Sequence, residues 1–261
     1  MNATLSDALK RLRLSGLARV LDIRLQEAAG AQLSHAEFLE LILADELIIR
    51  HERLMARRTQ AAGFRDLKTL EDFDWRFNTS VSRRALYDLA TCAFIRQRRD
   101  VLFIGPPGVG KSHLAQALGL SAIHLGHRVL YRSVFDLVRD LLQDEALDGE
   151  DNVLARYLKP DLLIIDDMGI KHLPKRSAEH LFEIVLRRHE NRSTIMTSNR
   201  PLEEWGKLIG DVPAATAILD RFLHHAEIIE ITGRSYRLKD RARTEKPEKK
   251  RTCTKATKSV Q

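Results

Sequence analysis

The chain has 261 residues, 44% of them hydrophobic and 30% charged, which is typical of a globular protein with one or two domains. It contains no apolar run of about 18 residues and its N-terminus lacks the apolar core of a secretory signal, so we expect neither a membrane span nor export. The net charge of +7 comes from the last segment, because residues 233–261 carry 11 Lys or Arg and 3 Asp or Glu, a net charge of +8. Residues 1–232 carry 32 Lys or Arg and 33 Asp or Glu, a net charge of −1. The body therefore cannot bind nucleic acid through bulk charge.

Residues 1–66 are predicted to form a small all-α domain. Leucines recur at helical spacing from Leu5 to Leu21, which predicts an N-terminal helix. Gly30 then interrupts the pattern, and we expect the helix to break there.

A second, longer helix is predicted for His35–Ala62. Ser34 and Glu37 stand at the spacing of a capping box, which marks the start of this helix. Gly63 is expected to end it, because glycine adopts the left-handed conformation that closes many helices. The positions expected to face a core are Phe38, Ile42, Leu47 and Leu54.

Four arginines give one face of the long helix a basic stripe. Their spacing places them on neighbouring turns of the helix. Such a stripe either faces solvent or contacts a DNA backbone, and DNA contact gains weight because the small helical domain precedes a nucleotide-binding domain. The candidate DNA-binding residues are Arg50, Arg53, Arg57 and Arg58.

Residues 67–239 are predicted to form the second domain, which begins with a connector. In this connector, Phe73 and Trp75 either pack on the body of the domain, the interpretation that we favour, or lie near a bound base. A helix is predicted from about Ser82 to Phe94, followed by a strand at 101–104.

A phosphate-binding loop follows this strand. The pattern G-x-x-x-x-G-K-S lies between the strand and a helix predicted at 112–125, which is the context that the motif requires. Its glycines let backbone N–H groups surround phosphates, the lysine reaches the β- and γ-phosphates, and the serine hydroxyl holds Mg²⁺. The expected nucleotide-binding residues are Gly105, Pro106, Pro107, Gly108, Val109, Gly110, Lys111, Ser112 and His113.

An acidic pair supplies the other half of a metal site. The apolar run 162–165 predicts a strand buried on both faces, and it ends in Asp166 and Asp167. We expect Asp166 to hold Mg²⁺ together with Ser112. We expect Asp167 to orient or deprotonate the attacking water.

The remaining pattern alternates strands with helices. Strands are predicted at 128–133, 193–199 and 227–231, and helices at 134–142, up to 159, and at 177–190. This alternation predicts a parallel sheet with right-handed crossovers, and ligands of such sheets bind at the carboxyl ends of the strands. Lys111, Asp166 and Asn199 all lie at or just past such ends, so we expect them in one site.

Two arginines near the end of this domain are candidates for contacts with the γ-phosphate. Arg221 ends a predicted helix and could reach the nucleotide of a neighbouring subunit, and Arg237 follows the last strand and could reach the nucleotide of its own subunit. Either arginine could instead be an ordinary surface residue. No insertion is large enough for the lid of a nucleotide kinase.

The segments GPPGVGKSHLAQALG, LLIIDDMG, TIMTSNRPLEEWG and AILDRFLHHAEIIEITGRSYRLK resemble AAA+ ATPases of the IstB and DnaC group. The resemblance covers about residues 5–239, and the long N-terminal helices are more similar to IstB, the helper ATPase of insertion-sequence transposition. It implies an ATP-hydrolysing homo-oligomer on double-stranded DNA that recruits or stimulates a transposase. It further implies that 105–112 is Walker A, that 166–167 is Walker B, that Asn199 is sensor 1, Arg221 the arginine finger and Arg237 sensor 2.

One departure from the family pattern concerns hydrolysis. The second Walker B acid is often glutamate, whereas Asp167 is one methylene shorter, and we expect slow hydrolysis. Two alternatives stay open, a helicase loader of the DnaC type and a DNA-binding scaffold that ATP assembles with little turnover.

The last segment, 240–261, has almost no apolar residues, and we predict a disordered basic tail. It either adds affinity for nucleic-acid phosphates or only keeps the protein soluble. Cys253 lies in this tail and Cys92 in a predicted helix. The two cysteines fit neither a disulfide framework nor a metal site, which favours a cytoplasmic protein.

Overall fold

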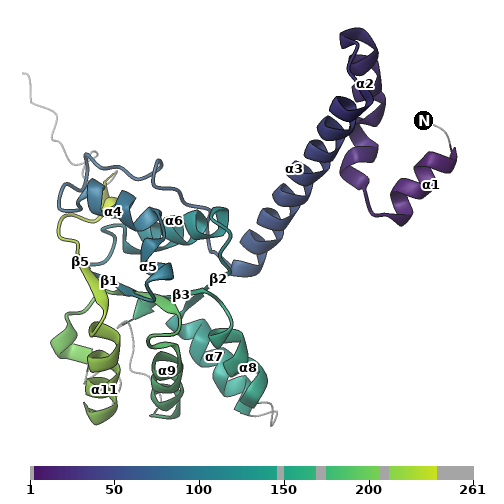
Figure 1. The fold of residues 1–261 in the computed structure, drawn as a ribbon. Helices are drawn as coiled ribbons and strands as arrows, with labels where there is room; N and C mark the ends of the chain where they lie inside the picture. The colour runs from purple at the N-terminus through teal and green to yellow at the C-terminus, as the bar shows by residue number, and fades with distance from the viewer. Residues whose placement is uncertain (1–2, 146–149, 169–174, 206–211, 240–261) are drawn as a thin grey trace, which may run out of the picture.

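The structure is a computed structural model that describes residues 3–145, 150–168, 175–205 and 212–239. The predicted basic tail, 240–261, lies outside these residues. The described chain forms an α/β body from which three N-terminal helices, here called the helical arm, project (Figure 1). None of the described helices combines the length and the apolar character that crossing a membrane requires.

The helical arm consists of α1 (Ala3–Arg11), α2 (Ser15–Ala31) and α3 (His35–Ala62). The capping box predicted at the start of α3 is confirmed: the Glu37 N–H donates to Ser34 Oγ (3.3 Å), and the Ser34 N–H donates to Glu37 Oε2 (2.8 Å). The predicted end is confirmed as well, because Gly63 closes the helix with φ 72°.

Two predictions for the arm were wrong. Gly30 does not break α2, which continues to Ala31 and turns at Gln32 with φ 51°; one exposed glycine costs a helix only about 1 kcal/mol. Leu47 and Leu54 do not face a core, since their exposed fractions are 67% and 36%. The reason is that α2 packs along only one side of α3, so the core of the arm is confined to Leu9, Leu17, Leu21 and Ile42.

The body contains a five-stranded sheet in the order β2-β3-β4-β1-β5. Every neighbouring pair of strands is parallel, which confirms the predicted fold class. The strands are β1 (Asp100–Ile104), β2 (Val129–Ser133), β3 (Leu162–Met168), β4 (Ser193–Ser198) and β5 (Ala226–Glu230).

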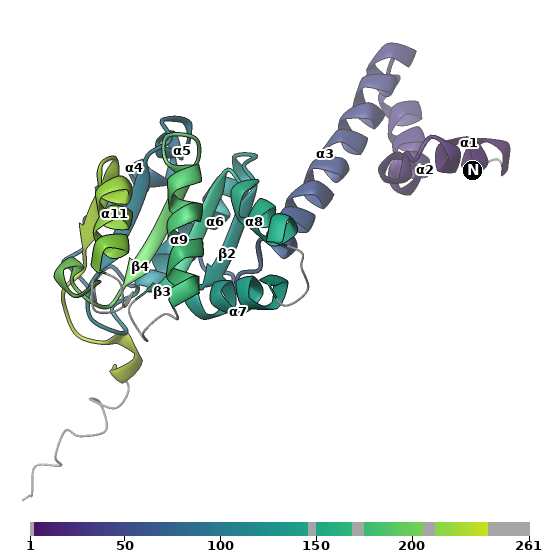
Figure 2. The same ribbon diagram turned by 90° about the horizontal axis from the view of Figure 1, so that it is seen from below.

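Alternating side chains of the strands form two cores, one on each face of the sheet. Val101 and Phe103 of β1 belong to one core, whereas Leu102 between them belongs to the other. The first face is covered by α4 (Arg83–Ala90), α5 (Ala93–Arg96) and α6 (Lys111–His124). The second face is covered by α7 (Val134–Glu145), α8 (Glu150–Leu158), α9 (Lys175–Arg188) and α11 (Val212–Leu223) (Figure 2).

The single helix predicted from about Ser82 to Phe94 is two helices, α4 and α5. Cys92 separates them in a left-handed conformation with φ 55°. Its side chain is fully buried, and this burial raises the pKa of the thiol to about 11. Cys92 is therefore an unreactive part of the core.

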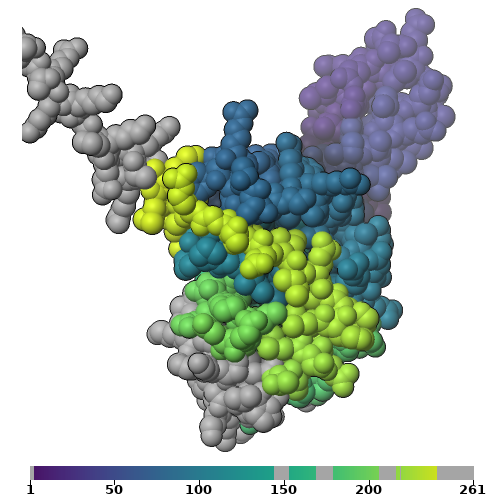
Figure 3. All heavy atoms as spheres, turned by 90° about the vertical axis from the view of Figure 1, so that its left-hand side faces the viewer, coloured from purple at the N-terminus to yellow at the C-terminus, as the bar shows by residue number. Residues whose placement is uncertain are grey.

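A short helix, η1 (Leu202–Glu204), follows β4. After β5 the chain crosses one face of the body, and the last described element is the short helix η2 (Tyr236–Leu238). Figure 3 shows this last segment in yellow beside the blue residues of the connector. Lys239 Nζ donates to Asp74 Oδ2 (2.6 Å), and the rings of Tyr236 and Phe77 meet edge to face with centroids 5.1 Å apart. These contacts join the connector directly to the C-terminal segment, and both segments approach the phosphate loop.

Candidate nucleotide-binding site

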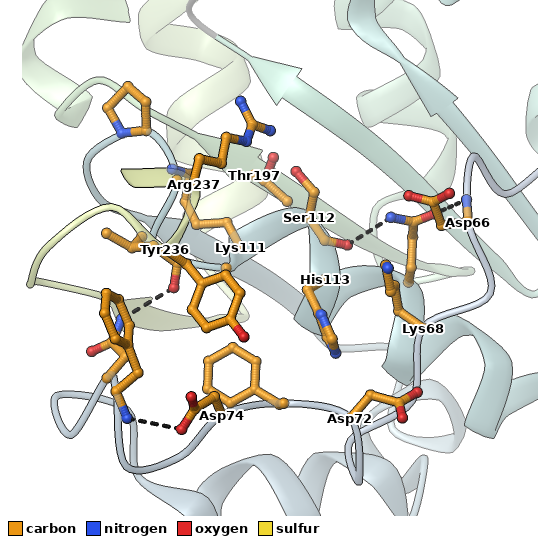
Figure 4. A pocket seen from close by; sticks show the side chains of 18 of the residues that line it. Asp66, Lys68, Asp72, Asp74, Lys111, Ser112, His113, Thr197, Tyr236 and Arg237 are labelled. Carbon is orange, nitrogen blue, oxygen red and sulfur yellow. Dashed lines mark hydrogen bonds between the residues drawn. The ribbon is translucent and has the colours of Figure 1, made fainter. Parts of the chain in front are cut away.

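A cavity of about 670 Å³ opens at the carboxyl ends of β1, β3 and β4. Three segments far apart in the sequence line it: the connector, the phosphate loop with the start of α6, and η2 (Figure 4). Parallel strands place their carboxyl ends at one edge, so the ends of β3 and β4 and the loop after β1 converge there.

The phosphate loop needs glycine at two positions. Gly108 and Gly110 have φ values of 83° and 105°, which other residues rarely adopt. A Cβ atom at Gly108 would lie 2.1 Å from Ser235 Oγ, and one at Gly110 would lie 2.6 Å from the ring of Phe73. The C-terminal segment and the connector therefore approach the backbone of the loop directly.

The Lys111 side chain is 8% exposed and folds back over the loop. Its Nζ donates to the carbonyl oxygens of Gly105 (2.7 Å) and Pro106 (2.8 Å). Burial lowers the pKa of the Lys111 ammonium, and the nearby charges of Asp166 and Asp167 oppose that shift. Gly105 and Pro106 thus lie behind the cavity as acceptors, whereas residues 107–113 line it.

Asp166 is fully buried at the end of β3 and accepts hydrogen bonds on both carboxylate oxygens. Ser112 Oγ donates to Oδ1 (2.9 Å), and the Thr197 hydroxyl donates to the same oxygen. The Tyr131 hydroxyl of β2 donates to Oδ2, and burial together with the Asp166 charge raises the pKa of Tyr131. Three neighbouring elements therefore fix the orientation of the Asp166 carboxylate beside the Ser112 hydroxyl.

Asp167 follows in a left-handed conformation with φ 64°, where the register between β3 and β4 shifts. Its N–H donates to Thr197 Oγ1 (3.0 Å), and its Oδ2 accepts from Arg65 Nη1 (3.1 Å). Burial raises the pKa of the Asp167 carboxyl and the neighbouring Asp166 raises it further, whereas Arg65 lowers it. The Asp167 side chain lines the cavity, unlike that of Asp166.

The other predicted site residues divide between the cavity and the surface. Asn199 and Arg237 line the cavity, and Asn199 Oδ1 is a buried atom without a hydrogen-bond partner among the described residues. Arg221 is exposed in the last turn of α11 and does not line the cavity.

The four arginines of the predicted stripe contact both the arm and the body. Arg50 pairs with Glu46 (2.7 Å) and donates to a carbonyl of the α1–α2 turn (3.1 Å). Arg53 donates to Ser15 Oγ, Arg57 to the carbonyl of Arg53 (3.4 Å), and Arg58 to the carbonyl of Gly126 in the body.

Several cavity residues were missed by the sequence analysis. Asn78 Nδ2 donates to the Val109 carbonyl (3.1 Å), and the Tyr236 N–H donates to the Gly108 carbonyl (2.8 Å), so both residues support the loop. The ring of Phe73 is 8% exposed and meets His113 edge to face, so the packing that we favoured for it is confirmed, and the ring also lines the cavity. The closely spaced aromatic residues of the connector were the sequence feature that could have predicted its place at the cavity. Other cavity residues missed are Lys68, Asp74, Phe77 and Thr197. Arg65 and Tyr131, which contact Asp167 and Asp166, were missed as well.

The donor set fits ATP and Mg²⁺. Among the described residues, the Lys111 ammonium donates only to backbone carbonyls of its own loop, and Asn199 offers an unpartnered buried oxygen in the same cavity. Ser112 and Asp166 place a hydroxyl and a carboxylate oxygen 2.9 Å apart, and oxygen ligands are those that Mg²⁺ prefers. Lys111 and residues 107–113 would hold the phosphates, and Ser112 and Asp166 would hold the metal ion.

This sheet order, with a phosphate loop between β1 and α6 and an acidic pair at the end of β3, defines a P-loop protein with the AAA+ fold. Two solved structures share that fold. The replication initiator DnaA bound to AMPPCP and single-stranded DNA superimposes with a TM-score of 0.55 at 23% identity, over 72% of this chain and 58% of that one. The DnaC helicase loader superimposes with a TM-score of 0.50 at 25% identity, over 59% of this chain and 91% of that one.

The chain belongs to the family described as IstB-like ATP binding protein, whose sequence profile matches residues 7–244. A relative from Pseudomonas aeruginosa, named for ATP binding and for the insertion sequence IS21, is 38% identical over 233 residues. That match covers 89% of this chain and 88% of the relative. The resemblance to the IstB group is thereby confirmed.

Proposed function

We propose that this protein hydrolyses ATP with Mg²⁺ and forms a homo-oligomer on double-stranded DNA that recruits or stimulates the transposase of its insertion sequence. The observation that carries the ATPase assignment is that Lys111, Ser112, Asp167 and Asn199 line one cavity, with the buried Asp166 in contact with Ser112 behind it. The transposase assignment rests on family membership and on relatives that are named for insertion sequences.

In this proposal each polar group has its own role. Lys111 neutralises the β- and γ-phosphates, and Asp166 orients the metal ion through its contact with Ser112. Asp167 orients the attacking water and accepts its proton, and Asn199 positions that water beside the γ-phosphate. Arg237, in the same cavity, contacts the nucleotide of its own subunit.

The location of Arg221 supports an oligomer. Because Arg221 is exposed on α11 and lies off the cavity, it can stabilise transition-state charge only at the nucleotide of a neighbouring subunit. The ATP site is then complete only between two subunits, which makes assembly depend on the nucleotide.

We assign the DNA contact to residues 1–66 and hydrolysis to residues 67–239, with residues 240–261 adding non-specific affinity. The exposed basic residues Arg53 and Arg57 of α3 support the first assignment. The short distance along the chain between α3 and Arg65, which contacts Asp167, gives DNA binding a direct route to the hydrolytic site.

The test is an ATPase assay on the wild type, Lys111→Ala and Asp167→Asn, with and without duplex DNA. Lys111→Ala should lose ATP binding, whereas Asp167→Asn should keep ATP and DNA binding and lose about 10² or more in rate. Wild-type turnover in Asp167→Asn contradicts the assignment of the base. ATP binding and assembly without turnover in the wild type favours the scaffold alternative.

A helicase loader is the second candidate, favoured by the superposition on DnaC. Affinity purification of the protein from cells that contain both a helicase and the transposase of the same insertion sequence separates the two. Recovery of the helicase alone overturns the transposase assignment.

A further inference from the structure

Three histidines and a glutamate gather at the edge of the sheet opposite the cavity. His189 and Glu190 directly follow α9, and His224 and His225 connect α11 to β5. The Asp100 N–H at the start of β1 donates to the His225 carbonyl (3.3 Å), which places this cluster at the amino ends of the strands. Figures 1 and 2 both show α9 and α11 side by side.

The side chains of the cluster are spaced like the ligands of a metal ion. Ligand atoms of His189, Glu190 and His224 all lie within 4.8 Å of one another. Glu190 Oε1 lies 3.7 Å from His189 Nε2 and 3.5 Å from His225 Nε2. In a tetrahedral zinc site with nitrogen and oxygen ligands at their usual distances, neighbouring ligand atoms are about 3.4 Å apart. Small side-chain rotations would therefore close the cluster around one ion.

A second observation comes from the burial of His189. Its side chain is only 10% exposed, and its Nδ1 is a buried atom without a hydrogen-bond partner among the described residues. A buried imidazole nitrogen without a partner costs free energy, which an ion bound through Nδ1 would offset. Because Nε2 is the nitrogen beside Glu190, this requires the ring to turn over, which exchanges the two nitrogens. Burial lowers the pKa of His189, and the Glu190 carboxylate opposes that shift.

We propose that His189, Glu190 and His224 bind one divalent transition-metal ion, with Zn²⁺ as the best match, and that water or His225 takes the fourth position. Two imidazoles and one carboxylate are a common protein ligand set for Zn²⁺. This site is separate from the Mg²⁺ site, which offers only oxygen ligands at the opposite edge of the sheet. A bound ion would link the end of α9 to the end of α11.

The first experiment titrates untagged, nucleotide-free, full-length protein with Zn²⁺ in a calorimeter and with Co²⁺ in a spectrophotometer. We expect one ion per chain, Co²⁺ bands typical of tetrahedral nitrogen and oxygen ligands without thiolate charge transfer, and a higher Tm in Zn²⁺. His224→Ala should lose this binding while keeping the metal-free Tm of the wild type, because His224 is exposed. His51→Ala, an exposed histidine of α3, is the matched control and should bind normally.

Four outcomes overturn the proposal. They are no ion bound by the wild type, unchanged binding in His224→Ala, loss of binding in Asp166→Asn, and one ion per two chains with dimers seen by light scattering. Loss in Asp166→Asn would place the ion in the nucleotide site, and the half stoichiometry would place it between chains. His189→Ala adds the buried ligand to the series, and if that variant does not fold, His224→Ala still decides.

Discussion

The α/β body and the helical arm are stabilised in different ways. The body has a core on each face of its sheet, and its strands β1, β3 and β4 are almost fully buried. The separate core of the arm contains only four buried side chains among the described residues, Leu9, Leu17, Leu21 and Ile42. Large apolar side chains of the arm are exposed, including Leu12 (66%), Ile23 (58%), Leu47 (67%) and Ile48 (56%). Exposed apolar surface is often an interaction site, so we expect the arm to make contacts with partners and the body to carry the chemistry.

The two regions meet at the candidate catalytic site. Gly63 ends α3, Arg65 contacts Asp167, and the Asp66 N–H donates to Gln116 Oε1 (3.1 Å) beside the phosphate loop. Two residues, Gly63 and Phe64, therefore separate α3 of the arm from Arg65. We therefore expect that binding of a partner to the arm can influence Arg65 and Asp167 through this short connection, without any change in the core of the body.

The largest effect is expected at the surface of the body that we propose to face a second subunit. Arg221→Ala should lower the ATPase rate by about 10³ while a single subunit still binds ATP, because the missing charge acts on a neighbour. Arg187→Ala, on the adjacent helix α9 and exposed, is the control and should be active. Steady-state phosphate release measures both.

Mixing Arg221→Ala with Lys111→Ala sharpens this test. Each variant retains one half of a site shared between subunits, so some mixed interfaces are complete and partial activity should return. Absence of recovery, when mass measurement confirms mixed oligomers, means that Arg221 acts within its own subunit or only in folding.

Stability should separate the two regions next. Leu118→Ala, in α6 and fully buried, should lower the free energy of unfolding by about 2–5 kcal/mol. Leu47→Ala, on the exposed face of α3, should change it by about 0.5 kcal/mol or less. Chemical denaturation of both variants measures the difference. A loss in Leu47→Ala as large as in Leu118→Ala would show that the exposed face of the arm is covered in solution.

DNA binding should depend on the arm more than on the tail. Replacing Arg53 and Arg57 together with Ala should reduce the slope of log affinity against log salt by about 2, roughly 0.9 for each lost phosphate contact. Replacing Arg139 and Arg187, exposed arginines of the body, is the control. Ending the chain after Lys239 should weaken binding less at working salt, since a fixed stripe loses less entropy than a flexible tail. If all of these proteins show the same slope of log affinity against log salt, the arm does not contact DNA phosphates.

The smallest effect concerns the contact that joins the regions. Asp167 must be ionised to accept a proton, and its raised pKa makes the rate fall on acidification at a higher pH than an ordinary aspartate would. Arg65 opposes that rise, so Arg65→Ala should move the acidic limb of the pH–rate profile to still higher pH, with the plateau changed only a few-fold. Arg65→Lys keeps the positive charge, so the acidic limb of its pH–rate profile should lie at the same pH as that of the wild type. A profile of Arg65→Ala that matches the wild type contradicts this coupling.

Local sequence patterns predicted both ends of α3 and the phosphate loop. Ser34, Glu37 and Gly63 act within one helical turn of the ends that they mark, and Gly108 and Gly110 are readable because few other residues adopt their backbone angles. The parallel sheet was readable from the alternation of strands and helices, and it placed the acidic pair near the loop.

The side-chain contacts of the site could not be predicted from the sequence, because they join residues that only the folded chain brings together. Arg65 and Asp167 are 102 residues apart, and Tyr131 and Asp166 are 35 apart, so no local pattern links them. The left-handed Asp167 depends on a register shift between two strands, and the exposure of Leu47 depends on which side of α3 its neighbour covers. Periodicity identifies an apolar residue but not its partner, because the partner is set by long-range packing.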